Sequence, residues 1–416
     1  MRTVGDQLAA VLSVARPVRP LDVVLTDAVG CILAVDLTVP TDVPAMPVAA
    51  CDGYALASED LEPATPSAPV QLPVVHDVWA AGGEALRLAA GQSIRISTGA
   101  PVPTGADAVV PLEFSDRGDV RVRIGYRPAV GANVVAAGAH ARRGDVAISA
   151  GTRMGARQIA LAASLGYARV RVHPKPRVVI MTIGDELVAP MRRLPSRDAD
   201  AEHVIYDANG PALRTAVQDA GATAIQVGPV SDEHAVLREA LEDQLVRADL
   251  VVTTGGLSDG PRDTVRDVLS PLGSVRFDRV SMSPGRLQGL GLLGEGDEAV
   301  PIFALLGQPV AAQISYEVFV RPALRAIAGY SEIYRPSVVA RATVGWPSVA
   351  GERQFVPATL QGAPGEGYQV TPVGDPARLA DWSVSALSDA NALVVVPEEQ
   401  SAVRPGDSLH CMILEG

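Results

Sequence analysis

Two glycine-containing segments of the chain carry side chains that could bind a phosphate group and its metal ion. The first spans residues 254–263 and directly follows an apolar stretch typical of a β-strand. It contains Gly255, Gly256 and Asp263. Glycines let backbone amides approach an anion, and the N-terminus of a following helix favours negative charge. The simpler interpretation, a tight strand-to-helix turn in which Asp263 caps the helix, is equally well supported by this segment alone.

The second segment places two neighbouring carboxylates, Asp185 and Glu186, directly after Gly184 at the end of another apolar stretch. Paired acids at the end of a strand suit a magnesium ion that also contacts a phosphate. A helix cap and the residue next to it would show the same two acids, and this is the commoner origin of such a pair. Both interpretations stay open at this point.

Both segments belong to a part of the chain in which apolar strands alternate with helical stretches. We predict strands at 178–181, 224–227, 250–254 and 302–306. This alternation is typical of a doubly wound parallel sheet, in which ligands bind beyond the carboxyl ends of the strands. The loops after Met181, Thr254 and Leu306 are therefore the first places to look for a site.

The flanking parts of the chain have a different sequence pattern. Apolar residues at helical spacing predict a helix over 4–15 with Thr3 as its N-cap, and another over 153–166 that ends at a glycine. Between these helices, and again after residue 329, short β-branched runs interrupted by Pro and Gly predict β-rich domains. The charged segment 192–200 lacks an apolar period and is predicted to be a mobile loop.

Composition limits the classes of function. The chain has 416 residues, 48% of them hydrophobic, which is enough for several cores, and its net charge of −12 argues against a nucleic-acid or anionic membrane partner. Lys175 is the only lysine. The three cysteines, Cys31, Cys51 and Cys411, have no pairing pattern, which predicts reduced thiols in a cytoplasmic protein. No apolar stretch reaches the roughly 18 residues of a membrane span, so no membrane insertion is expected.

Seven motifs spread over the whole chain occur in a recognisable order. They lie at residues 50–55, 97–103, 184–187, 206–209, 255–263, 283–286 and 307–310. In this order and separation they resemble the motifs of the molybdopterin molybdenumtransferase family, known as MoeA in bacteria and as the E-domain of gephyrin in animals.

The resemblance implies a magnesium-dependent reaction in which molybdate is inserted into the dithiolene of adenylylated molybdopterin and AMP is released. It implies Mg²⁺ as the cofactor, and a pterin and molybdate as substrates. By motif position, Asp52, Thr98, Glu186 and Asp263 match the catalytic residues, and Asp232 joins Glu186 and Asp263 around the metal. The matching substrate-binding positions are Gly255, Gly256, Ser258, Ser283, Arg286, Gly307 and Gln308.

The resemblance also implies the architecture, an elongated multidomain chain of α/β and β-rich domains that forms a homodimer. Asp52 and Thr98 lie in the domain that crosses to the partner subunit in this family. The expected domains are a linking domain I (1–46 and 141–176), an inserted β-rich domain II (47–140), a doubly wound α/β domain III (177–328) and a barrel-like domain IV (329–416).

Several residues depart from the family's pattern at positions that are expected to take part in the reaction. Ser283 and Arg286 stand where the family has lysines, Gln308 where it has asparagine and Ala311 where it has serine, while Asp259 adds an acid to an anion-binding loop. Each lost donor to a developing charge costs roughly 3 kcal/mol, or about a hundredfold in rate.

Three hypotheses therefore stay open. The first is an active molybdenumtransferase. The second is a gephyrin-like dimeric scaffold with a decayed site, which binds a tubulin-like cell-division protein or the tail of a membrane receptor. The third is a sensor that binds a pterin without converting it.

Overall fold

The computed structural model describes residues 1–81, 86–190, 204–257, 263–375 and 384–414. They form two compact units, which are described separately. The α/β unit contains Met1–Ala34, Gly151–Gly155 and Arg169–Gly416, and the β-rich unit contains Val35–Ala150 and Ala156–Ala168. The predicted mobile loop at 192–200 lies outside the described residues.

A six-stranded sheet forms the centre of the α/β unit. Its strands occur in the order β16 (Thr223–Val230), β13 (Arg177–Ile183), β17 (Leu250–Thr254), β21 (Val300–Leu305), β20 (Leu287–Leu293) and β18 (Gly273–Arg279). The first four are parallel, and the last two complete the sheet in antiparallel fashion. The four strands predicted from the sequence are thus the parallel part of this sheet, which confirms the doubly wound fold.

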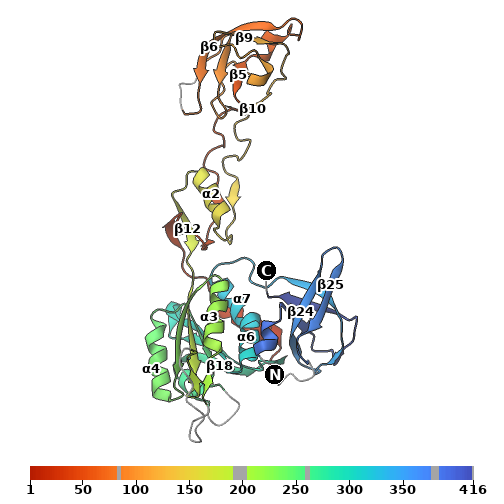
Figure 1. Cartoon of the computed structure of the whole chain (residues 1–416). Coiled ribbons are helices and arrows are strands. Elements are labelled where there is room, and N and C mark those ends of the chain that lie inside the picture. Colours follow the sequence, from red (N-terminus) through yellow and green to blue (C-terminus); the bar gives the residue numbers. More distant parts are fainter. Residues whose placement is uncertain (82–85, 191–203, 258–262, 376–383, 415–416) are drawn as a thin grey trace. The chain divides into compact units, whose positions relative to one another are not determined.

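Helices cover both faces of this sheet (Figure 1). On one face lie α1 (Val4–Val14), α3 (Asn209–Asp219), α6 (Pro309–Ser315) and α7 (Arg321–Ile327); on the other lie α4 (His234–Leu245) and α5 (Thr264–Leu269). Successive residues of β13 point to opposite faces, so Ile180 packs on the first side and Met181 on the second. Because both faces are buried, only the ends of the strands are open to a ligand.

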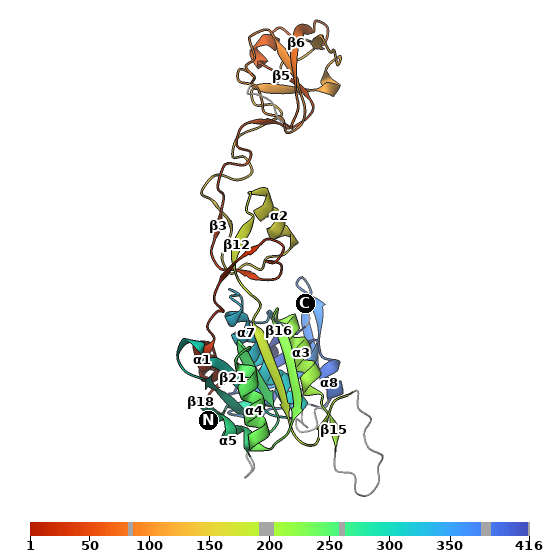
Figure 2. The ribbon, with the colours of Figure 1, turned by 90° about the vertical axis from the view of Figure 1, so that its left-hand side faces the viewer.

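The first helix confirms its prediction closely. The Oγ1 atom of Thr3 accepts a hydrogen bond from the backbone nitrogen of Asp6 at 3.0 Å, as an N-cap residue should. The backbone nitrogen of Arg2 donates to the carbonyl of Arg279 at 2.9 Å, which places the N-terminus beside β18 (Figure 2).

The second predicted helix is shorter than expected. Helix α2 covers Ala156–Ser164, not 153–166. The backbone of Met154 instead exchanges hydrogen bonds with Gly30 and Cys31, at 2.8 and 2.9 Å, and so belongs to extended structure. This segment adjoins a small sheet of β1 (Leu21–Val24), β12 (Arg169–His173) and β2 (Ile32–Leu33). The glycine expected after the helix, Gly166, has φ +83°.

The β-rich unit is built on a five-stranded sheet. Its order is β8 (Ala108–Pro111), β5 (Gly53–Leu56), β7 (Ser93–Ile96), β6 (Val70–Val78) and β9 (Arg121–Ile124). Two short ladders accompany it, β3 (Leu37–Thr38) with β11 (Val146–Ile148) and β4 (Val48–Ala49) with β10 (Val134–Val135). Separate apolar clusters cover the two faces of β5, one around Ala55 and the other around Tyr54.

The C-terminal part of the α/β unit forms a barrel, as predicted. Its ring is β24 (Arg353–Ala363), β25 (Gly367–Pro372), β22 (Ser337–Ala342), β28 (Ser408–Ile413) and β26 (Ala392–Val396), and pairing of β24 with β26 closes it. The short elements of the unit are β14 (Leu187–Val188), β15 (Ile205–Tyr206), β19 (Met282–Ser283), β23 (Trp346–Pro347), β27 (Ala402–Val403) and α8 (Val384–Ser388). The division of the whole chain into four domains stays a prediction.

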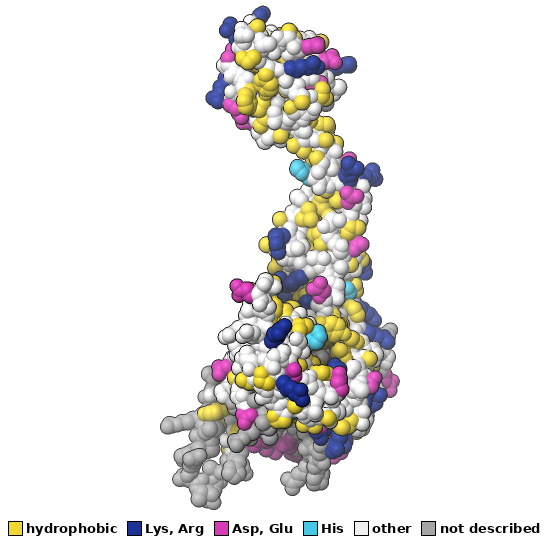
Figure 3. Space-filling model, turned by 90° about the vertical axis from the view of Figure 1, so that its right-hand side faces the viewer, with side chains coloured by type: hydrophobic (Ala, Val, Ile, Leu, Met, Phe, Trp, Pro, Cys, Tyr) yellow, Lys and Arg dark blue, Asp and Glu magenta, His cyan; other side chains and the backbone are white. Residues whose placement is uncertain are grey.

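Three smaller expectations concern the surface and the thiols. All three cysteines are free, and burial raises the pKa of Cys411 to about 11. Among the described helices, none is both long and apolar enough to cross a membrane. On the face drawn in Figure 3, basic and acidic side chains are interspersed in both units.

Candidate functional site

The carboxyl ends of three neighbouring strands bring glycines into backbone contact. Gly255, after β17, has φ +90°, and a Cβ atom there would lie 2.1 Å from the carbonyl oxygen of Ile183 in β13. A Cβ atom on Gly307, after β21, would lie 3.2 Å from the Cα atom of Gly255. A side chain at position 255 would clash with Ile183, so only glycine fits there. The short distance between Gly307 and Gly255 means that the two predicted substrate-binding loops pack directly against each other.

A buried asparagine ties these loops to the start of α3. The Nδ2 atom of Asn209 donates to the carbonyl of Gly307 at 2.8 Å and to Oγ1 of Thr254 at 3.0 Å. The Oγ1 atom of Thr254 in turn donates to the carbonyl of Leu306 at 2.9 Å. Asn209 is 7% exposed, and within the described residues its buried Oδ1 atom accepts no hydrogen bond. One side chain therefore fixes the ends of β17 and β21.

Asp207 anchors the same turn to the central strand β13. One carboxylate oxygen accepts from Oγ1 of Thr182 at 2.9 Å, and the other accepts from the backbone nitrogen of Gly210 at 2.9 Å. Both Asp207 and Asn209 belong to the 206–209 motif, which contributed to the family resemblance, but neither was predicted as a site residue. Their position at a strand-to-helix turn was the available signal.

Two predicted acidic residues lie on the face of the sheet that α4 and α5 cover. The Oδ1 atom of Asp232 would be 3.4 Å from a Cβ atom on Gly256, and it is buried without a hydrogen-bond partner among the described residues. Asp263 caps α5, because its Oδ1 atom accepts from the backbone nitrogen of Arg266 at 3.1 Å. Its Oδ2 atom forms an ion pair with Nε of Arg266 at 3.2 Å. The capping interpretation of Asp263 is thus confirmed.

Glu186 occupies an exposed turn between β13 and β14. The helix-cap alternative for Asp185 and Glu186 is wrong, since a short strand follows instead of a helix. Across the described part of the chain, no three acidic, histidine or cysteine side chains converge as a metal-binding group. Glu186, Asp232 and Asp263 are therefore not gathered into such a group.

Three other predicted substrate-binding residues do come together. Ser283, Arg286 and Gln308 line one pocket of about 290 Å³ beside the end of β21. Arg286 forms an ion pair with Glu352 of the barrel, whose side chain is 9% exposed. The Oε1 atom of Gln308 caps α6 by accepting from the backbone nitrogen of Ala311 at 2.6 Å. Ser258, the remaining predicted binding residue, lies outside the described residues.

Asp52 and Thr98 form a separate pair in the β-rich unit. The Oδ1 atom of Asp52 accepts hydrogen bonds from the backbone nitrogen of Thr98 at 2.7 Å and from its Oγ1 atom at 2.8 Å. The backbone bond, followed by the hydroxyl bond, lowers the pKa of this carboxyl. Both residues are exposed, so Asp52 is an ionised acceptor at the surface of its own unit.

Comparison with known proteins covers almost the whole chain. The family model described as the MoeA N-terminal region (domain I and II) matches residues 2–166. The model described as a probable molybdopterin binding domain matches 179–326, and that of the MoeA C-terminal region (domain IV) matches 339–414.

Individual relatives agree with these models. Molybdopterin molybdenumtransferase 1 of Mycobacterium tuberculosis is 37% identical, over 98% of this chain and 97% of the relative. Molybdopterin molybdenumtransferase 2 of the same organism is 36% identical, over 98% of both chains. A solved structure of the molybdopterin biosynthesis MoeA protein from Pyrococcus horikoshii is 28% identical, with a TM-score of 0.85 over 100% of this chain and 99% of that one.

Proposed function

The chain belongs to the molybdopterin molybdenumtransferase (MoeA) family of molybdenum cofactor biosynthesis, and from this membership we propose that it inserts molybdate into adenylylated molybdopterin with release of AMP. The observation that carries the proposal is the packing of the Gly255 and Gly307 loops at the carboxyl edge of the parallel sheet. Glycines let the backbone of such loops approach a phosphate closely, and this edge is where such folds bind ligands.

Magnesium fits this edge if the substrate supplies most of its ligands. Mg²⁺ keeps several waters and usually takes one or two carboxylates together with substrate phosphates. The buried Oδ1 atom of Asp232 lies beside Gly256 and accepts no hydrogen bond from the described residues, which suits that role, whereas Asp263 is already paired with Arg266. When bound, the ion would stabilise charge on the phosphoanhydride. In this proposal Asp232 holds the ion, and Glu186 and Asp263, which do not converge with it as a metal-binding group in the described residues, are not assigned as ligands.

Asp52 and Thr98 contribute an ionised carboxylate to the substrate site in this proposal. The two hydrogen bonds from Thr98 keep Asp52 charged and fix its orientation. As in the family, the β-rich unit would supply this pair to the active site of a partner subunit, so that the working form is a homodimer. The cytoplasmic location stays a prediction.

Complementation tests the proposed activity. The chain is expressed in a cell that lacks its own molybdenumtransferase, and nitrate reductase activity is measured. We expect restored activity, and loss of most of it in Asp232→Asn. Asp263 needs two variants, because Asp263→Asn removes the charge but keeps an N-cap, whereas Asp263→Ala removes both. Absence of activity from a folded, dimeric wild-type chain would contradict the proposal.

A gephyrin-like scaffold is the second candidate, and one observation favours it. At two positions that depart from the family, the side chains are used inside the protein: Arg286 pairs with Glu352 and Gln308 caps α6. A decayed site would tolerate such changes. This candidate predicts a saturable protein partner, such as a tubulin-like division protein or a receptor tail, whose binding is unaffected by Asp232→Asn.

A further inference from the structure

The β-rich unit has a pocket of its own, next to Asp52. The pocket has a volume of about 260 Å³ and lies at the rim of the five-stranded sheet. In a strand, alternate side chains share a face. The register pairs Tyr54 with Arg95 and Arg95 with Asp77, so both charged side chains lie on the face of Tyr54. Residues just beyond the strand ends complete the lining: Asp52, Trp79, Ser97 and Leu112.

Trp79 forms an exposed aromatic wall of this pocket. Its side chain is 60% exposed, and it is one of three tryptophans in the chain. Tryptophan buries a large flat area when a ring stacks on it, and such surfaces are preferred contact sites. A ligand with a flat ring would cover an apolar surface that is now open to water.

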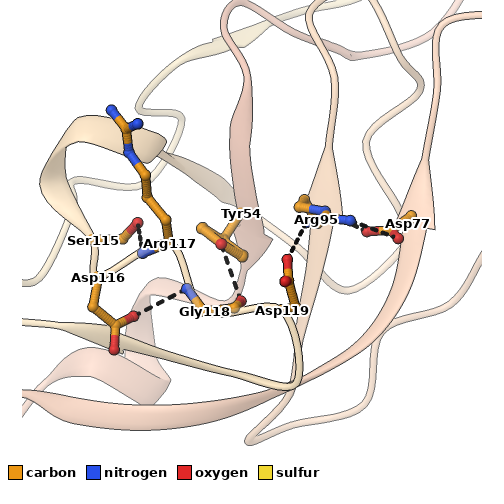
Figure 4. Close-up of polar contacts among 8 residues, drawn as sticks. All are labelled: Tyr54, Asp77, Arg95, Ser115, Asp116, Arg117, Gly118 and Asp119. Carbon is orange, nitrogen blue, oxygen red and sulfur yellow. Dashed lines mark hydrogen bonds and ion pairs between the residues drawn. The ribbon is translucent and has the colours of Figure 1, made fainter.

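The pocket is acidic, because its one cation is already neutralised. Arg95 donates to both carboxylate oxygens of Asp77, at 2.6 and 3.0 Å, and also forms an ion pair with Asp119 (Figure 4). Nearby, the hydroxyl of Tyr54 donates to the carbonyl of Gly118 at 3.1 Å, which fixes the loop that carries Asp119. Asp52 also lines the pocket and is ionised, so two carboxylates and one already paired guanidinium line it. Such surroundings repel phosphate and molybdate.

Asp52 offers the pocket an acceptor. Both donors of Thr98 go to Oδ1, and Oδ2 accepts no hydrogen bond from the described residues. A carboxylate oxygen binds N–H donors strongly. The aminopyrimidinone edge of a pterin has two adjacent N–H donors, whereas the corresponding edge of adenine has one donor beside an acceptor.

We propose that this pocket binds the pterin ring of the substrate, stacked on Trp79 with its N–H edge toward Asp52. The inference rests on the proposed function and deepens it, because it assigns the uncharged head of the substrate to the β-rich unit. The phosphate end of the substrate then binds outside this pocket.

The test uses the full chain and two ligands without phosphate, hydroxymethylpterin and adenosine. Isothermal titration calorimetry should give tighter binding of the pterin. Trp79→Ala should weaken it roughly tenfold or more, a typical loss for a stacked base, and Trp79→Phe should weaken it less. Asp52→Asn should abolish the preference for pterin, since the amide replaces an acceptor by a donor. Phe114→Ala is the matched control, because Phe114 is also 60% exposed in the same unit and does not line the pocket.

Wild-type chain that does not bind the pterin, or that prefers adenosine, would overturn the inference. Equal pterin binding by wild type and Trp79→Ala would do the same. Complementation separates this result from the proposed function. Restored nitrate reductase without Trp79-dependent binding rejects only the pocket, and Trp79-dependent binding without restored activity rejects only the transferase.

Discussion

At the carboxyl edge of the six-stranded sheet, the predicted site depends on glycine loops and on buried polar side chains that bond within the protein. At the rim of the five-stranded sheet, Asp52 and Thr98 are exposed and bond mainly to each other. The departures at 283, 286 and 308 all lie in the first region. Backbone geometry defines that region, so its side chains can change without loss of the fold. In the second region the proposed role depends on the side chains themselves.

Replacement of Gly255 by alanine should have the largest effect and would test whether backbone geometry defines the first region. The new Cβ atom would lie 2.1 Å from a carbonyl oxygen at φ +90°, so we expect a loss of about 3–5 kcal/mol in unfolding free energy, measured in urea. Gly351→Ala is the matched control: its φ is +88° with no atom within 4 Å, and it should cost about 1 kcal/mol. Equal losses would show that the close contact is unimportant.

Asn209→Ala should lower the stability by about 2 kcal/mol, because two hydrogen bonds from a buried side chain are lost. It should also reduce complementation, since the Gly307 loop loses its anchor. Asn391→Ala provides the control. Asn391 also makes two hydrogen bonds, both to Leu360 in the barrel, so it should cost similar stability and leave complementation intact. Equal loss of complementation in both variants would mean that stability alone explains the effect.

Arg286→Met should cost about 1 kcal/mol in thermal or urea unfolding. The half-exposed guanidinium contributes little by itself, but its removal leaves the nearly buried Glu352 carboxylate without its cation. Arg276→Met, at an exposed position of β18, should change the stability by less than about 0.5 kcal/mol. If the two variants behave alike, the Arg286–Glu352 pair does not stabilise the fold.

Thr98→Val should have the smallest effect on the fold and would sharpen the description of the second region. Loss of the hydroxyl bond should raise the pKa of Asp52 toward its ordinary value, without reaching it, because the stronger backbone bond stays. A lowered carboxyl pKa stabilises the folded state above the ordinary pKa, and this contribution disappears as the pH falls through the lowered value. Carboxyl NMR titration measures the shift. Thr104→Val, in the same loop, should leave the pKa unchanged; an equal shift there would contradict the assignment.

The sequence predicted the parallel strands well, because continuous apolar runs such as 250–254 are buried on both faces and leave a strong signal. It placed the start of α2 three residues too early, since pairing of Met154 with Gly30 and Cys31 is a long-range contact that no local pattern encodes. Asn209 was missed as a site residue for the same reason: its partners, Thr254 and Gly307, are distant in sequence.

Closure of the C-terminal barrel has a consequence for recognition. Each strand of the ring, from β22 to β28, already has a hydrogen-bonded neighbour on both sides. An extended peptide that docks by β-augmentation needs a free sheet edge. In the described residues the ring leaves only short stretches with a free side, such as 337–339 of β22 and 359–363 of β24. A protein that binds this barrel must therefore depend mainly on its side chains and loops, so mutations of surface side chains would disrupt such a complex.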